Sequence, residues 1–142
     1  MLPLLEQVLE HNKTTVKLVY KQLPLVRIHK NAMPAAIASM AAAKQGKFWE
    51  MHDQLFANSS QLSEEKIDEI AKNIGLDFAK FKQDLNDPQI RQLINRDMQE
   101  SQKNGVRGTP TIFVNNRLLR DRSPAGFQAA IDKALAESKA KK

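Results

Sequence analysis

The sequence predicts an α/β domain in which a long helical block separates a first strand from a later β-hairpin. Apolar residues recur at helical spacing through Asn31–Asn104. They alternate with polar residues in Thr15–Lys21, and two asparagines stand at the centre of Thr111–Leu119. The 142 residues, 42% of them hydrophobic, fit one domain with a single core and are too few for two independent domains.

Composition excludes several classes of function. The chain contains no cysteine, which excludes disulfides, thiolate metal sites and cysteine nucleophiles within these residues. Its three histidines include no pair spaced for one helix face, so a zinc site has little support. The net charge of +6 is scattered and no row of aromatic residues accompanies it, which argues against nucleic-acid binding. No apolar run approaches the ~18 residues of a membrane span.

The first elements are a helix and a strand. A helix over residues 2–11, ended by Asn12, is predicted by four apolar residues at helical spacing, and Pro3 is tolerated in its first turn. These four residues are Leu2, Leu5, Val8 and Leu9. Alternation and β-branched residues predict a strand over Thr15–Lys21. Leu23–Lys30 contains a proline and is predicted as a loop.

Start and stop signals divide the helical block and define the end of the chain. The predicted N-caps are Ser63, Asp77 and Asp87, and the predicted closing glycines are Gly46, Gly75 and Gly105. Asn115-Asn116 predicts a tight turn between strands Thr111–Val114 and Arg117–Leu119. Ser123-Pro124 then caps a final helix.

In this order of elements the first strand stands alone and the first helix has no strand before it. One further strand upstream would give β-α-β, a helical crossover and β-β-α. That completed order and four segments in register resemble the thioredoxin fold and, within it, the DsbA-like thiol:disulfide oxidoreductases. The segments are Leu23–His29, Ala32–Ala36, Gly46–His52 and Val106–Pro110.

The resemblance covers residues 1–135 and implies one thioredoxin-like domain over 1–142 with a helical insertion at about 31–104. In the family, the first strand is followed by Cys-x-x-Cys at the start of a helix that contains a proline, and Pro3 is similar to that proline. The two cysteines would then lie just upstream of Met1. We therefore expect an N-terminally incomplete domain, which a start assigned too far downstream explains best. A naturally degenerate relative and completion by another subunit are the alternatives.

The resemblance also implies a substrate-binding site. It places Thr109 and Pro110 beside the cysteines, with a cis bond between them and the Thr109 backbone paired to an extended substrate. The alternative is an ordinary trans proline that opens a strand. The implied partner is a protein or peptide outside the cytoplasm, with no cofactor, metal or nucleic acid. Exchange needs two thiols, so the 142 residues alone cannot perform it. The second hypothesis is a non-catalytic peptide-binding or assembly module.

Other residues have structural interpretations. His52, on an apolar stripe beside Phe48 and Phe56, is predicted to be a hydrogen-bonded core histidine, and Trp49 a packing residue. The resemblance to the thioredoxin fold implies that the missing first strand lies between Thr15–Gln22 and the hairpin, so its absence would leave strand edges unpaired. We therefore expect a homo-oligomer whose contact includes the apolar face of the first helix.

Overall fold

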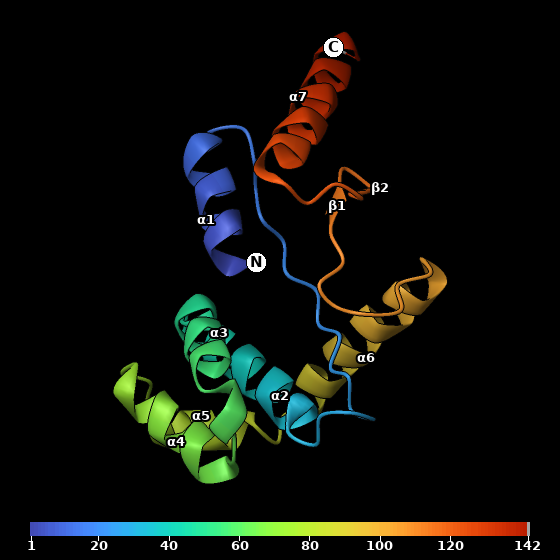
Figure 1. Ribbon diagram of the computed structural model, residues 1–142. Helices are drawn as coiled ribbons and strands as arrows, with labels where there is room; N and C mark the ends of the chain where they lie inside the picture. The colour runs from blue at the N-terminus through green and yellow to red at the C-terminus, as the bar shows by residue number, and fades with distance from the viewer. Residues whose placement is uncertain (142) are drawn as a thin grey trace. The chain divides into compact units, whose positions relative to one another are not determined.

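Helices occupy most of residues 1–141, which are the residues that the computed structural model describes (Figure 1). The chain divides into two units. One is Lys21–Arg107, and the other combines Met1–Tyr20 with Gly108–Lys142. The predicted helical block lies inside the first of these, and each unit is described by itself below.

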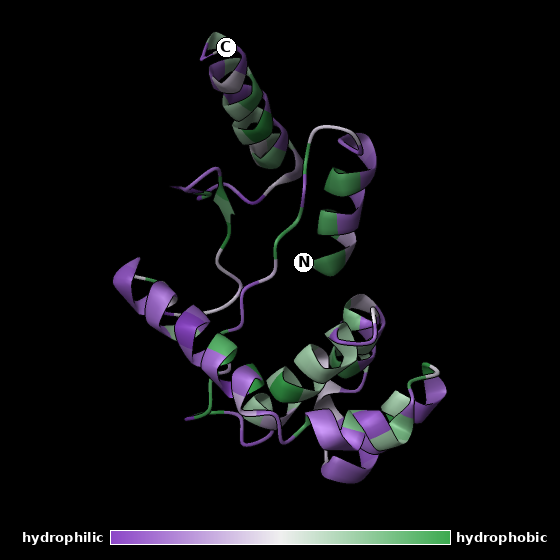
Figure 2. Ribbon diagram, turned by 180° about the vertical axis from the view of Figure 1, so that it is seen from behind, coloured by the Kyte–Doolittle hydropathy of each residue, from purple (hydrophilic) through white to green (hydrophobic). Residues whose placement is uncertain are grey.

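The unit Lys21–Arg107 is a helical assembly around α2 (Ala32–Ala43). The further elements are α3 (Phe48–Ala57), the 3-10 turn η1 (Ser59–Gln61), α4 (Glu64–Asn73), α5 (Phe78–Asp84) and α6 (Pro88–Lys103). In Figure 2, α2 is pale to green, whereas the long helix α6 is mostly purple. A helix that is apolar all round belongs inside a fold, and α2 contacts each of α3, α4, α5 and α6.

Small side chains explain why four helices pack against α2. Ala38, Ala41 and Ala42 are completely buried, so neighbouring backbones approach closely. The larger core side chains come from the surrounding helices, and Met51, Phe81 and Ile94 are the largest fully buried ones. The stripe predicted from helical spacing therefore forms the core of this unit.

The predicted helix caps are confirmed. The side chains of Ser63, Asp77 and Asp87 each accept a hydrogen bond from a backbone N–H in the first turn that follows. Gly75 and Gly105 end α4 and α6 with φ of +81° and +68°, a backbone conformation that strongly favours glycine. These local signals fix the helix boundaries.

Buried polar side chains tie the ends of this unit together. The Gln22 backbone N–H donates to the Asp97 carboxylate at 2.9 Å, and its side chain donates to Ser39 Oγ at 2.8 Å. Both partners lie on helices, α6 and α2, so the chain entering the unit is bonded to two of them. Sequence periodicity does not predict these contacts because they join residues far apart in the chain.

The second unit contains α1 (Leu2–His11), β1 (Phe113–Val114), β2 (Arg117–Leu118) and α7 (Pro124–Ala140). α1 packs against α7. Asn12, which ends α1 as predicted, donates from Nδ2 to Gln128 Oε1 at 3.2 Å. The predicted final helix is confirmed and extends to Ala140, and Phe127 and Ile131 are its buried residues.

The predicted hairpin is confirmed, with a two-residue turn. Asn115 and Asn116 have φ of +44° and +67°, as a tight turn between twisted strands requires. Phe113 pairs with Leu118 in antiparallel register. The Leu119 backbone N–H donates to the Ile112 carbonyl at 2.8 Å, so the pairing continues one step beyond β1 and β2.

The strand predicted over Thr15–Lys21 is not formed. Thr15 ends a turn, and Val16–Tyr20 runs without helix, turn or β-bridge (Figure 1). Exposure still alternates, with Val16 and Leu18 half-buried and Lys17 and Val19 exposed. The sequence pattern therefore predicted the side-chain alternation correctly from Val16 to Val19, whereas Tyr20, expected on the face of Val16 and Leu18, is 40% exposed. A strand also needs a hydrogen-bonded neighbour, and no described residue provides one.

Candidate functional site

The candidate site is the loop Gly108–Thr111, which leads into the hairpin. The bond between Thr109 and Pro110 is cis. Both residues are exposed, and no hydrogen bond joins the Thr109 backbone N–H or C=O to another residue among 1–141. These two groups are therefore open to a binding partner.

Two side chains hold the loop around Thr109. Thr111 Oγ1 donates a hydrogen bond to the Gly108 carbonyl at 2.6 Å, and this bond joins the two ends of the loop. Arg122 Nη1 donates to the Pro110 carbonyl at 2.9 Å from a segment twelve residues further along the chain. The loop is thus fixed on both sides of Thr109, while the Thr109 backbone itself stays open.

The start of α7 positions Arg122. The backbone N–H of Ser123 donates to Asp121 at 2.9 Å, and Ser123 in turn caps α7 by accepting from the Gly126 N–H. Hydrogen bonds from the Ser123 N–H and hydroxyl lower the pKa of the Asp121 carboxyl. A Cβ at position 126 would collide with the carbonyl oxygen and side chain of Asp121, so glycine is needed there. Arg122 therefore sits in a locally fixed turn.

The family follows from comparison with known proteins. A family model described as Thioredoxin matches residues 2–133. The chain belongs to the thioredoxin family. A solved structure titled as a thioredoxin-like oxidoreductase from Silicibacter pomeroyi DSS-3 superposes with a TM-score of 0.81 at 27% identity. That comparison covers 95% of this chain and 77% of the other. The predicted thioredoxin-like α/β fold with its helical insertion is confirmed.

Curated relatives of this thioredoxin-family chain are named as antiporters. It is 39% identical over 116 residues to the Na(+)/H(+) antiporter NhaA 3 of Salinispora tropica, covering 82% of this chain and 18% of that protein. It is 36% identical over 110 residues to the Na(+)/H(+) antiporter NhaA of Herminiimonas arsenicoxydans, covering 78% and 17%. The chain thus spans less than a fifth of the length of these relatives.

The thioredoxin-family chain carries no thiol and no metal cluster in the part described. It has no cysteine in 142 residues. Within residues 1–141, no group of three or more histidine and carboxylate side chains is placed to hold a metal ion. No described helix is long and apolar enough to cross a membrane. The groups that the structure shows at the loop Gly108–Thr111 are the unbonded Thr109 backbone and the hydrogen bonds from Thr111 and Arg122.

His52 and Trp49 belong to the other unit, Lys21–Arg107, and the predicted structural role of His52 is confirmed. The His52 side chain is 4% exposed, and its Nδ1 lies 3.0 Å from Asp53 Oδ1. Its ring packs 4.8 Å from Phe56 and 5.2 Å from Trp49, measured between centroids. Trp49 contacts this ring as predicted but is itself 41% exposed.

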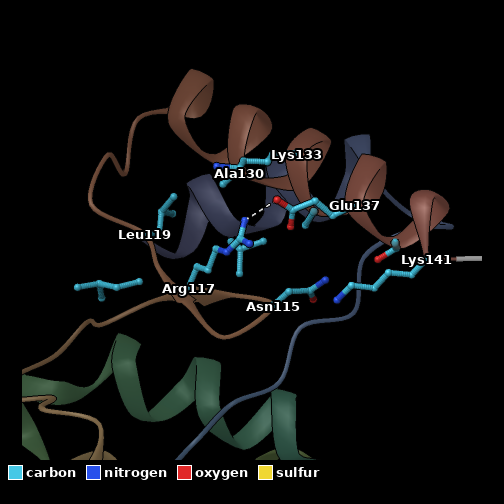
Figure 3. Close-up of a pocket in the computed structure, with 11 residues that line it drawn as sticks. Asn115, Arg117, Leu119, Ala130, Lys133, Glu137 and Lys141 are labelled. Carbon is cyan, nitrogen blue, oxygen red and sulfur yellow. Dashed lines mark hydrogen bonds and ion pairs between the residues drawn. The ribbon is translucent and has the colours of Figure 1, made fainter.

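A shallow pocket of about 280 Å³ lies between the hairpin and α7 (Figure 3). The Arg117 side chain crosses this pocket, and its Nη1 donates a hydrogen bond to Glu137 Oε1 at 2.7 Å. The hydrogen bond from Arg117 lowers the pKa of the Glu137 carboxyl. Lys133 and Lys141 also line the pocket, so most of its charged lining residues are cationic. The ion pair links β2 to α7.

Proposed function

We propose that this chain is the substrate-binding part of a DsbA-like thiol:disulfide oxidoreductase acting on extended segments of protein substrates. The observation that carries the proposal is the loop Gly108–Thr111. Its two ends are held by Arg122 and Thr111, while the Thr109 backbone has no partner among the described residues. A fixed, unpaired backbone group recognises an extended peptide through main-chain hydrogen bonds.

The chemistry of thiol–disulfide exchange determines which role this chain can have. A thiolate attacks a disulfide sulfur and forms a mixed disulfide, which a second thiol then resolves. Since the 142 residues contain no cysteine, both thiols would come from outside them. The contribution of Thr109 is to hold the substrate chain so that its sulfur meets those thiols. The likeness to a structure titled as a thioredoxin-like oxidoreductase supports this proposal.

A fusion tests the proposal. A β-strand followed by Cys-x-x-Cys is added before Met1, and reduction of insulin is measured against the same fusion with Ser-x-x-Ser. We expect turnover only with the cysteines, and none from the 142-residue chain alone. Insulin reduction by that chain alone, or an inactive but folded cysteine fusion, would refute the proposal.

Two variants of the active fusion test the role of the Thr109 backbone. Thr109→Pro removes the N–H that a substrate would bond, whereas Thr109→Val keeps it and removes only the hydroxyl. We expect KM for insulin to rise about tenfold with proline, the equivalent of about one hydrogen bond, and to change little with valine. Equal changes in KM with the two variants would contradict the proposal that the Thr109 backbone N–H binds the substrate.

We further propose a location outside the cytoplasm, in the periplasm or beyond, where disulfides persist. The support is the DsbA-like order of segments in the sequence. Fractionation of the native host with an antibody to this chain tests it. Recovery in the cytoplasmic fraction alone would overturn the assignment.

The alternative candidate is a non-catalytic peptide-binding or assembly module. Two observations favour it: the absence of cysteine and the match to short segments of proteins named as antiporters. Such a module would use the same loop without redox chemistry. The cysteine fusion distinguishes the two, because a module would bind extended peptides through Thr109 while the folded fusion stayed without turnover.

We also propose that the chain forms a homo-oligomer through the apolar face of α1. The four apolar residues of that face are only half-buried, although α1 packs against α7. These residues are Leu2, Leu5, Val8 and Leu9. Apolar area left outside a core favours association.

A further inference from the structure

The pocket between the hairpin and α7 has an excess of positive charge. Its volume is about 280 Å³, and all the residues that line it belong to the unit that contains α7. Its cationic lining residues are Arg117, Lys133 and Lys141, and Glu137 is the one acidic side chain among the described lining residues. The pocket therefore carries more positive charge than the Glu137 carboxylate balances.

Only part of the hydrogen-bonding capacity of Arg117 is used. Arg117 Nη1 donates to Glu137 Oε1 at 2.7 Å, and its guanidinium makes no other hydrogen bond to a described residue. A guanidinium carries several N–H donors in a planar fork and binds a carboxylate most strongly through two of them at once. The single bond to Glu137 therefore leaves the other donors of Arg117 open to a second carboxylate.

The charges of the pocket are accessible to a ligand. The side chains of Arg117 and Glu137 are 61% and 43% exposed, and ion pairs between exposed side chains contribute little to stability. Lys133 and Lys141 form no ion pair with any residue among 1–141. In Figure 3, the Lys141 side chain points toward Asn115 at one end of the pocket. An incoming anion thus meets a guanidinium and an ammonium without having to open a core.

Apolar side chains line the pocket beside these charges. Leu118 and Leu119 belong to the hairpin, and Ala130 and Ala134 belong to α7. Leu118 is 49% exposed, which is high for a large apolar residue, and covering it would remove apolar surface from water. Sites for small molecules combine an apolar lining of this kind with a few convergent polar groups.

We propose that this pocket binds a small organic acid, with its carboxylate on Arg117 and Lys141 and its short apolar part against Leu118. A carboxylate is the expected anion because the same guanidinium already bonds the carboxylate of Glu137. The volume of about 280 Å³ restricts the ligand to a small molecule. The proposal goes beyond the proposed function because it involves neither a thiol nor the loop that carries Thr109.

The test titrates the 142-residue chain with hexanoate and follows the backbone amide signals by NMR. Hexanoate has a carboxylate and an apolar chain, whereas hexanol lacks the charge and acetate lacks the chain. We expect saturable shifts at the amides of Leu118, Leu119 and Ala134, and a Kd for hexanoate about tenfold lower than for either control. The advantage over hexanol should shrink at high salt, which screens the charges.

Two variants break the same ion pair and should have opposite effects on binding. Arg117→Ala removes the guanidinium and should raise the Kd for hexanoate about tenfold, whereas Glu137→Gln removes the competing carboxylate and should lower it about tenfold. Loosening of the hairpin would act in the same direction in both variants, so it cannot imitate this result. Lys139→Ala is the control for net charge, because Lys139 lies on α7 outside the pocket lining, and it should change the Kd little.

Three results would overturn the proposal. The first is the absence of saturable shifts at the pocket amides with hexanoate. The second is a Kd for hexanol or for acetate equal to that for hexanoate at low salt, which would mean that the charge or the apolar lining plays no part. The third is weaker binding in both Arg117→Ala and Glu137→Gln, which would assign the effect to the ion pair as a structural link. The cysteine fusion and the Thr109 variants test the proposed function separately, since neither changes a residue of this pocket.

Discussion

The Arg122 guanidinium donates a 2.9 Å hydrogen bond to the Pro110 carbonyl and so ties the turn before α7 to the loop that carries Thr109. The contact joins two exposed residues, so burial does not explain it. Asp121 and Gly126 set the geometry of the turn from which Arg122 reaches the loop. Arg122 therefore acts as a positioning residue for the candidate site.

Replacing Arg122 should loosen the loop without unfolding the chain. With Arg122→Ala, we expect lower backbone order parameters at the Thr109 and Thr111 amides in NMR relaxation, because the Pro110 carbonyl loses its donor. The free energy of unfolding should fall by no more than about 1 kcal/mol, the size of one hydrogen bond. Arg120→Ala is the matched control, since Arg120 is also exposed and makes no hydrogen bond to a described residue. Equal order parameters at Thr109 and Thr111 in the two variants would contradict the positioning role.

A buried carboxylate makes the helical unit sensitive to acid. Asp84 accepts from Lys80 at 2.6 Å and from Lys44 at 2.9 Å, and these hydrogen bonds lower the pKa of its carboxyl. Lys44 also bonds Asp87, which lowers the pKa of that carboxyl as well. Because both folded-state pKa values lie below those of the unfolded chain, the stabilisation is complete above the ordinary aspartate pKa of ~4. It is lost as the pH falls through the lowered values.

We expect Asp84→Asn to lower the free energy of unfolding by about 1–3 kcal/mol at neutral pH, as loss of hydrogen bonds to charged groups does. The difference from the wild-type chain should shrink at acid pH, where the wild-type Asp84 carboxyl is protonated and, like asparagine, carries no charge. Urea denaturation at neutral and acid pH measures both effects. Asp68→Asn removes a more exposed pair with Lys82 and should cost less than about 1 kcal/mol. A loss of unfolding free energy with Asp84→Asn that is the same at neutral and acid pH would contradict this explanation.

The small residues of α2 give a test of packing. Ala38 has no exposed area, so Ala38→Leu must push neighbouring helices apart and should cost about 1–3 kcal/mol of unfolding free energy. Ala43, at the exposed end of the same helix, is the control, and Ala43→Leu should be close to neutral. Thermal denaturation of the two variants compares them directly. Equal melting temperatures would mean that α2 is not tightly enclosed.

The sequence predicted those features that depend on neighbouring residues. Ser63 and Asp87 cap helices where the sequence predicts caps, and Asn115-Asn116 forms the predicted turn. Each of these signals acts over a few residues, so the local sequence contains all the information needed. The thioredoxin-like fold was predictable for a different reason, because the order of elements and four segments in register carried the resemblance.

The remaining features depend on partners that are distant in the chain. Arg122 has no periodic or motif signal that connects it to Pro110, so the sequence does not predict this contact. Asp84 resembles any polar residue near a helix end until folding brings Lys44 beside it. Val16–Tyr20 has the alternation of a strand, yet alternation reports which side chains are covered and not whether a neighbouring strand exists. Sequence patterns therefore predicted elements and boundaries better than the contacts between elements.

The proposed homo-oligomer gives the last prediction. Leu5 lies on the half-buried apolar face of α1, whereas Gln7 lies on its exposed face. If that face forms the contact, Leu5→Glu places a charge in the interface and should shift the chain to monomer by more than tenfold in dissociation constant. Gln7→Glu adds the same charge on the exposed face and should leave association unchanged. Light scattering across micromolar concentrations measures the assembly, and circular dichroism verifies that both variants keep their helix content. A wild-type chain that stays monomeric throughout this range would show that packing of α1 against α7 already covers enough of the apolar face.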